Sequence, residues 1–78
     1  MTRSGRKGSA AARDTVSVHE MMAAARMEAG LTQAEMARLM RTTQSTIARM
    51  ETGGRYPNLT TLEMWAEVTG KRLEVRFV

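Results

Sequence analysis

Residues 31–51 contain two short helical patterns joined by a tight turn, and this arrangement constrains the fold more than any other feature of the sequence. Thr32 and Glu35 have the spacing of a capping box, in which each side chain satisfies a free amide at a helix start. Apolar residues then recur at helical spacing, and Thr42-Thr43 interrupts them with residues that favour caps over helix interiors. The second helix is predicted to begin at Gln44. The apolar residues of the two patterns are Met36, Ala37, Met40, Ile47 and Met50.

The outward face of the second predicted helix is suited to contact with nucleic acid. It carries Gln44, Ser45, Ala48 and Arg49. The polar members can hydrogen-bond base edges or phosphates, and the alanine is small enough for close approach. A compact helix-turn-helix with this kind of second helix is the geometry that enters a DNA major groove. We therefore expect double-stranded DNA as a partner.

These residues closely resemble the lambda repressor-like (XRE, phage repressor/Cro) helix-turn-helix family, from about Met22 to Gly70. The matching segments, in order and at family spacing, are Gly30–Gln33, Thr42–Ile47, Arg49–Gly53, Pro57–Leu62 and Trp65–Ala66. The resemblance implies a four-helix DNA-binding domain. The sequence departs from the family pattern at Arg41, where glycine is usual because glycine takes positive φ without steric cost. Either Arg41 bears a cost of about 1 kcal/mol or the turn has another shape.

The predicted DNA contacts divide into base contacts and phosphate contacts. Gln44 begins the second helix of the motif, so its amide can pair with adenine N6 and N7, and Ser45 and Arg49 are the next positions toward the groove. Arg49 could contact either guanine or a phosphate. The resemblance makes Gln33 a phosphate contact that also steadies Gln44. The remaining predicted phosphate contacts, which position without specifying, are Thr43, Thr46, Arg55, Tyr56 and the amides of Gly53 and Gly54.

Other residues are predicted to be structural. The resemblance implies an ion pair between Arg26 and Glu51, because the matching positions in related phage repressors form one. Four of the eight methionines fall where a helical core needs apolar side chains, so we expect packing and not a soft-metal site. These are Met22, Met36, Met40 and Met50, and we also expect Trp65 in the core.

The composition is that of one small domain without a disulfide framework or a recognisable metal site. Seventy-eight residues suffice for one domain, and no cysteine is present for a disulfide or thiolate metal site. His19 is the single histidine and lacks companion zinc ligands. No apolar run approaches membrane-spanning length and no hydrophobic signal region is present, so we expect a cytoplasmic protein. We expect no metal and no cofactor.

Positive charge is concentrated in two places. All four excess cations lie in the first 13 residues (Arg3, Arg6, Lys7 and Arg13), and from Asp14 onward the chain is formally neutral. Within that neutral part, residues 36–50 carry three arginines and no acidic residue. Positive potential on the helix-turn-helix suits a polyanion partner. Residues 1–14 are predicted to be a disordered arm that either follows the DNA backbone or remains a solvated tail.

The coarse organisation is an arm over 1–14, a helix-turn-helix domain over 15–70 and a C-terminal strand over 71–78. Ser17 can cap a first helix to about Ala29, and Asn58 can cap a fourth helix through Val68. The predicted buried stripe of that fourth helix is Leu59, Leu62, Trp65 and Ala66. The predicted fold is therefore mainly α, a four-helix lambda repressor-like domain with a C-terminal β-strand.

The C-terminal segment changes period from helix to strand. Its apolar residues Leu73, Val75 and Phe77 alternate with charged ones, which predicts a strand with one apolar face. The chain offers no obvious second strand, so we expect antiparallel pairing with a second copy, a homodimer and a palindromic operator. The alternative is strand addition to the sheet edge of another protein.

Two classes of function remain open. A short C-terminal strand behind a four-helix core resembles the antitoxins of host-inhibition-of-growth (HigA) toxin–antitoxin pairs, whereas many phage-type repressors continue into a fifth, dimerising helix. The resemblance implies an autoregulating repressor that also binds an RNA-cleaving toxin, or alternatively a phage-type immunity repressor or other XRE regulator without a toxin. The other class is a protein-interaction module that presents its C-terminal strand. No catalytic set is recognisable, so we expect no enzyme.

Overall fold

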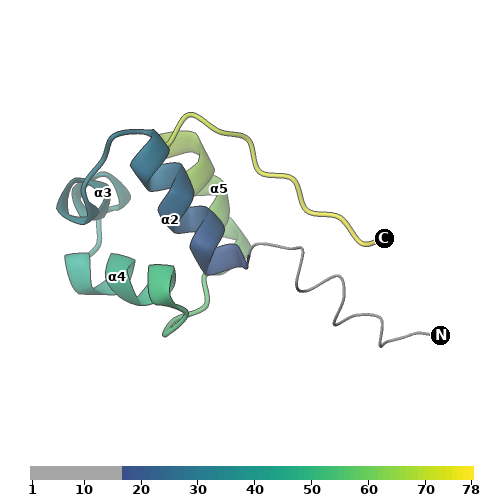
Figure 1. The fold of residues 1–78 in the computed structure, drawn as a ribbon, viewed down its shortest axis with the longest axis horizontal. Helices are drawn as coiled ribbons and strands as arrows, with labels where there is room; N and C mark the ends of the chain where they lie inside the picture. The colour runs from purple at the N-terminus through teal and green to yellow at the C-terminus, as the bar shows by residue number, and fades with distance from the viewer. Residues whose placement is uncertain (1–16) are drawn as a thin grey trace.

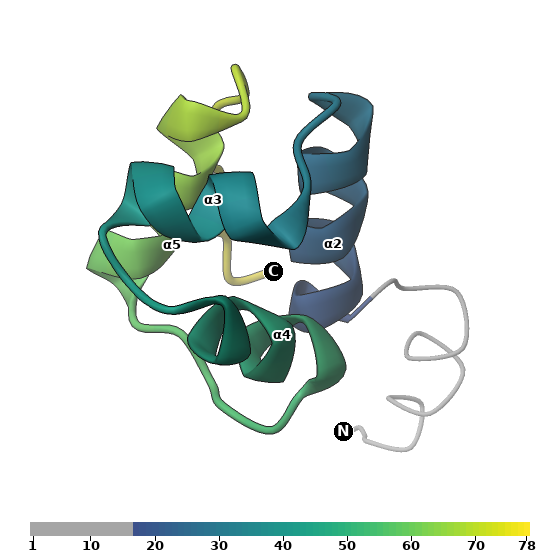
Figure 2. The same ribbon diagram turned by 90° about the vertical axis from the view of Figure 1, so that its left-hand side faces the viewer.

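The computed structural model describes residues 17–78 and contains four helices in this part of the chain. They are α2 (Val18–Glu28), α3 (Gln33–Met40), α4 (Gln44–Thr52) and α5 (Leu59–Val68). Figures 1 and 2 show α3 and α4 together at one end of the molecule, with the C-terminal segment leaving from the opposite side. The predicted arm over residues 1–14 lies outside the described residues.

The helix starts follow from local capping chemistry. Thr32 Oγ1 accepts from the amide of Glu35 at 3.0 Å, and the carboxylate of Glu35 accepts from the amide of Thr32 at 2.8 Å. Thr43 caps α4 through the amide of Thr46, and Asn58 caps α5 through the amide of Thr61 at 2.8 Å. Each cap satisfies a backbone donor that has no partner within its helix. The predicted starts at Gln44 and after Thr32 and Asn58 are confirmed.

The core lies where the helices meet and is rich in methionine. Its buried residues are Met22, Met36, Ala37, Met40, Ile47, Met50 and Trp65. The prediction that four methionines serve as core residues is confirmed. Trp65 Nε1 donates to the carbonyl oxygen of Met22 at 2.9 Å, so the buried indole N–H has a partner and α5 is held against α2. The core thereby sets the position of α3 and α4.

One residue of the predicted α5 stripe is exposed. Trp65 is buried and Leu62 and Ala66 are half-buried, but Leu59 is 54% exposed. Leu59 is the first residue of α5, just after the loop that ends at Asn58. Helical spacing assigns it to the buried face, but no neighbouring helix covers that end of the face.

Residues 71–78 run as an extended segment without regular secondary structure, and no strand is present among residues 17–78. A strand requires a ladder of hydrogen bonds to a neighbouring strand, and the described part of this single chain supplies none. The predicted C-terminal strand is therefore not observed in the single chain, and its formation with a second chain stays a prediction. Leu73 is half-buried, whereas Val75 and Phe77 are exposed.

Candidate nucleic-acid interface

The turn between α3 and α4 has the left-handed backbone that the family pattern assigns to glycine. Arg41 has φ 58° and ψ 48°, and it is the one non-glycine residue with positive φ among residues 17–78. The amide of Thr42 donates to the carbonyl oxygen of Ala37 at 2.9 Å, which satisfies a carbonyl at the end of α3. The turn therefore keeps its tight form with an arginine in the strained position.

The first turn of α4 presents a row of polar side chains. Thr43 Oγ1 lies 3.1 Å from Ser45 Oγ and 2.9 Å from Thr46 Oγ1, so these hydroxyls bond to one another. Gln44 and Ser45 are exposed, and the side chain of Gln44 makes no hydrogen bond within residues 17–78. Its amide thus keeps its donors and its acceptor available for an external partner.

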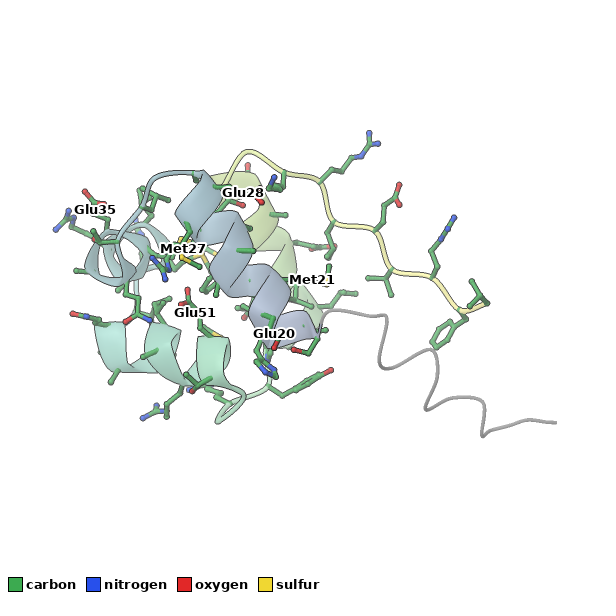
Figure 3. All side chains as sticks on the ribbon, viewed as in Figure 1. Glu20, Met21, Met27, Glu28, Glu35 and Glu51 are labelled. Carbon is green, nitrogen blue, oxygen red and sulfur yellow. The ribbon has the colours of Figure 1, made fainter. Side chains whose placement is uncertain are left out.

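The same surface carries positive charge without opposing acids. Arg38, Arg41, Arg49 and Arg55 are all exposed, and none of the four forms an ion pair with residues 17–78. Glu35 projects at the start of α3, outside the acid-free segment 36–50 (Figure 3). Unpaired arginines beside an exposed amide give a surface that attracts phosphates.

A buried ion pair fixes the end of α4 against α2. Arg26 Nε donates to Glu51 Oε2 at 2.6 Å, and Arg26 Nη2 donates to Glu51 Oε1 at 3.0 Å. Arg26 Nη1 also donates to the carbonyl oxygen of Leu31 at 2.8 Å. Glu51 extends from α4 toward α2 in Figure 3, and its side chain is only 4% exposed. The bidentate bond to Glu51 raises the pKa of Arg26, which keeps the guanidinium charged.

Gln33 is attached to this ion pair. Its Nε2 donates to Glu51 Oε1 at 3.1 Å, and it makes no hydrogen bond to Gln44 within the described residues. The start of α3 is therefore tied to the end of α4, which orients the two helices of the motif. Sequence reasoning missed this bond, because 18 residues separate the two positions and no local pattern links them.

The backbone amides that follow α4 donate back to the end of that helix. The amides of Gly53, Gly54 and Arg55 all donate to the carbonyl oxygen of Arg49, with distances of 2.8 Å from Gly54 and 3.2 Å from Arg55. These donors close the end of α4, and the phosphate contact predicted for the Gly53 and Gly54 amides stays a prediction. The side chains of Arg55 and Tyr56 remain exposed, with Tyr56 at 77%.

Comparison with protein families agrees with this geometry. The model of the family described as Helix-turn-helix (HTH_3) matches residues 22–75. The chain belongs to the helix-turn-helix family. The protein is a DNA-binding transcription regulator of the XRE, lambda repressor-like type. Comparison with curated proteins and with solved structures gives no significant match.

The match to the helix-turn-helix family covers α3, α4 and their turn. Residues 17–78 hold no cluster of three metal-binding side chains. None of the four helices is long and apolar enough to cross a membrane. The described side chains on α3, α4 and the adjoining loop include an exposed amide, hydroxyls and unpaired arginines.

Proposed function

We propose that this helix-turn-helix protein is a sequence-specific transcriptional repressor that reads its operator with Gln44, Ser45 and Arg49. The observation that carries the proposal is the exposed, unbonded amide of Gln44 at the first turn of α4, beside four exposed arginines. A side-chain amide in that position can donate to N7 of adenine and accept from its N6 amino group in one bidentate contact. Base contacts of this kind discriminate sequence, whereas charge alone does not.

The surrounding residues have positioning roles in this proposal. The side chains of Thr43, Thr46, Arg55 and Tyr56 contact phosphates and set the register of α4 on the duplex. Gln33 donates one amide proton to Glu51, which leaves its second proton for a phosphate and its carbonyl oxygen for the amide of Gln44. The Arg26–Glu51 pair holds the end of α4 against α2, and the bond from Gln33 to Glu51 holds α3 against α4. Rigid support of this kind is what a precise base contact requires.

The repressor is proposed to act as a homodimer on a palindromic operator. Two copies related by a two-fold axis would present two α4 helices to successive major grooves, about 34 Å apart. The exposed apolar side chains of residues 71–78 support a contact outside the helical core.

The test begins with selection of an operator from random duplex DNA by the purified protein. The variant Gln44→Ala should then lose about 1–3 kcal/mol of binding free energy on the selected operator and almost none on a scrambled duplex. Binding titrations at one fixed salt concentration measure both. Circular dichroism of the variant controls for folding, since Gln44 is exposed and its loss leaves the core intact. Equal losses on both duplexes would reduce Gln44 to a phosphate contact, and failure to select any sequence would reject the repressor.

A second, narrower function is antitoxin activity. The observation that favours it is the exposed apolar segment after α5, in which Val75 is 62% and Phe77 102% exposed, and which could add to the sheet of a toxin. Co-expression with the neighbouring genes should then yield a complex with an RNA-cleaving protein and relieve its growth arrest. A phage lysogeny neighbourhood without such a gene would instead favour an immunity repressor. Protein binding without any DNA preference would favour a pure interaction module.

A further inference from the structure

An apolar groove lies on the side of the molecule away from α3 and α4. Its volume is about 650 Å³, and it lies between α2, α5 and the first residues of the C-terminal segment. Met21, which is 57% exposed, lies on this side of α2 (Figure 3). The apolar side chains that line the groove include Val18, Met21, Ala25, Leu62, Trp65 and Leu73.

The C-terminal segment borders this groove but does not fill it. Its start is held in place, because the amide of Lys71 donates to the carbonyl oxygen of Ala66 at 2.7 Å and Lys71 Nζ pairs with Glu28 at 2.6 Å. Leu73 and Val75 line the groove, whereas Phe77 lies beyond it and is fully exposed. Residues 17–78 of a single chain thus leave both an apolar groove and an aromatic side chain in water, which is unfavourable for each.

We infer that residues 72–78 pair antiparallel with the same residues of a second copy, with Val75 opposite Val75 on the two-fold axis. This inference deepens the homodimer of the proposed function by specifying its register. In this register Leu73 lies opposite Phe77 of the second copy on one face, and Glu74 lies opposite Arg76 of the second copy on the other face. Leu73, Val75 and Phe77 then share one face, whereas Val78 lies opposite Arg72 on the other. Every charged side chain that faces another charged side chain across the strands meets one of opposite sign.

The neighbouring registers are less favourable on charge or on burial. Centring the pair on Glu74 places Glu74 opposite itself and Arg72 opposite Arg76, which gives like charges throughout. Centring it on Arg76 places two arginines face to face. Centring it on Leu73 keeps an Arg72–Glu74 pair but leaves Phe77 beyond the start of the other strand. Shifts by one residue mix apolar and charged side chains on the same face.

The Val75-centred register also explains what covers the groove. Leu73 lines the groove of its own copy, so the Phe77 that lies opposite it belongs to the second copy and reaches the same groove. The two-fold axis makes the exchange reciprocal, and each copy contributes the aromatic side chain that the other lacks. The occupant of the groove is therefore the C-terminal segment of a second copy.

The test uses two charge reversals, each of which should weaken the homodimer alone and leave it nearly unchanged when both are present. Glu74→Arg and Arg76→Glu should each weaken the homodimer roughly tenfold or more, because both symmetry-related ion pairs become like-charge pairs. An equal mixture of the two variants should recover the dimer, since each arginine then faces a glutamate of the other chain. The double variant should dimerise within about threefold of the original protein. Sedimentation across micromolar concentrations at low salt measures all four.

The outcomes distinguish this register from its competitors. A stronger dimer with Arg76→Glu would indicate the Glu74-centred register, and an unaffected Arg76→Glu would indicate the Leu73- or Arg76-centred one. Either result overturns the inference, as does an unmodified protein that stays monomeric at tens of micromolar.

Phe77→Ala should weaken the dimer by about 100-fold or more, since two aromatic side chains leave the interface. Binding of each variant to a single operator half-site is measured in parallel. That binding should persist if only the dimer is lost, and its absence in the unmodified protein would instead reject the repressor.

Discussion

Replacement of Arg41 by glycine should make this protein more stable. Arg41 has φ 58°, and the residues with positive φ that follow the other three helices are all glycines, Gly30, Gly53 and Gly70. The left-handed conformation brings the Cβ of an L-residue too close to the following carbonyl oxygen, whereas glycine has no Cβ. Arg41 is exposed and has no ion pair within residues 17–78, so no lost contact should offset the relief of strain.

The magnitude follows from two opposing terms. Relief of the left-handed strain contributes about 1–2 kcal/mol. The extra backbone freedom of glycine in the unfolded chain costs about 0.4–1 kcal/mol. The net expectation for Arg41→Gly is therefore a gain of roughly 0.5–1 kcal/mol in the free energy of unfolding. For a domain of this size that gain raises the Tm by roughly 2–8 °C.

Urea denaturation followed by circular dichroism measures the change, with two matched controls. Arg41→Ala removes the same side chain but keeps the strained Cβ, so its stability should stay close to that of the original protein. Arg38→Gly removes an exposed arginine from the interior of α3, and it should cost about 1 kcal/mol because glycine is unfavourable in a right-handed helix. If Arg41→Gly is no more stable than Arg41→Ala, the turn is not strained and the argument from φ is refuted.

Two further predictions concern the buried pair and the capping box. Glu51→Ala should lower the free energy of unfolding by about 3 kcal/mol, because it leaves the charge of Arg26 without its partner. The control Glu63→Ala, on the exposed surface of α5, should change the free energy of unfolding by less than about 0.5 kcal/mol in the same urea titration. Comparable effects of both would show that the pair does not hold α4. The hydrogen bonds from Thr32 lower the pKa of Glu35 below its ordinary value of 4.5. The unfolded chain therefore protonates Glu35 more readily than the folded chain does, and the free energy of unfolding should fall as the pH drops below 4.5 toward the lowered pKa. In Glu35→Gln the amide oxygen can still accept from Thr32, but the side chain no longer titrates. The free energy of unfolding of this variant should therefore fall less steeply with acid, and an unchanged dependence on pH would contradict the role given to Glu35.

Much of the fold could be predicted because it depends on neighbouring residues. Thr32, Thr43 and Asn58 each satisfy an amide three residues ahead, so a short window of sequence contains both partners of the bond. The core methionines recur at helical spacing, and that spacing alone assigns them to one face. The same logic assigned Leu59 to the core and was wrong there, since spacing specifies a face but not whether another element covers it.

The candidate site could be predicted only in part. The exposed positions of Gln44, Ser45 and Arg49 agree with the outward face derived from helical spacing. The sequence did not predict that the amides of Gly53 and Gly54 donate to the carbonyl oxygen of Arg49. That outcome depends on the dihedral angles of the turn after α4, where Gly53 has φ 88°, and composition does not specify them.

The sequence by itself determined where the helices begin, which methionines are apolar core and where positive charge gathers, because those properties depend on residues within a turn or two. Only the tertiary structure decided that Gln33 bonds to Glu51, that Trp65 bonds to Met22 and that Phe77 is fully exposed among residues 17–78. The two hydrogen bonds join residues 18 and 43 positions apart, and the exposure of Phe77 depends on where the chain runs after α5. Contacts between residues far apart in the sequence are set by how the helices pack, and no local pattern of residues encodes them.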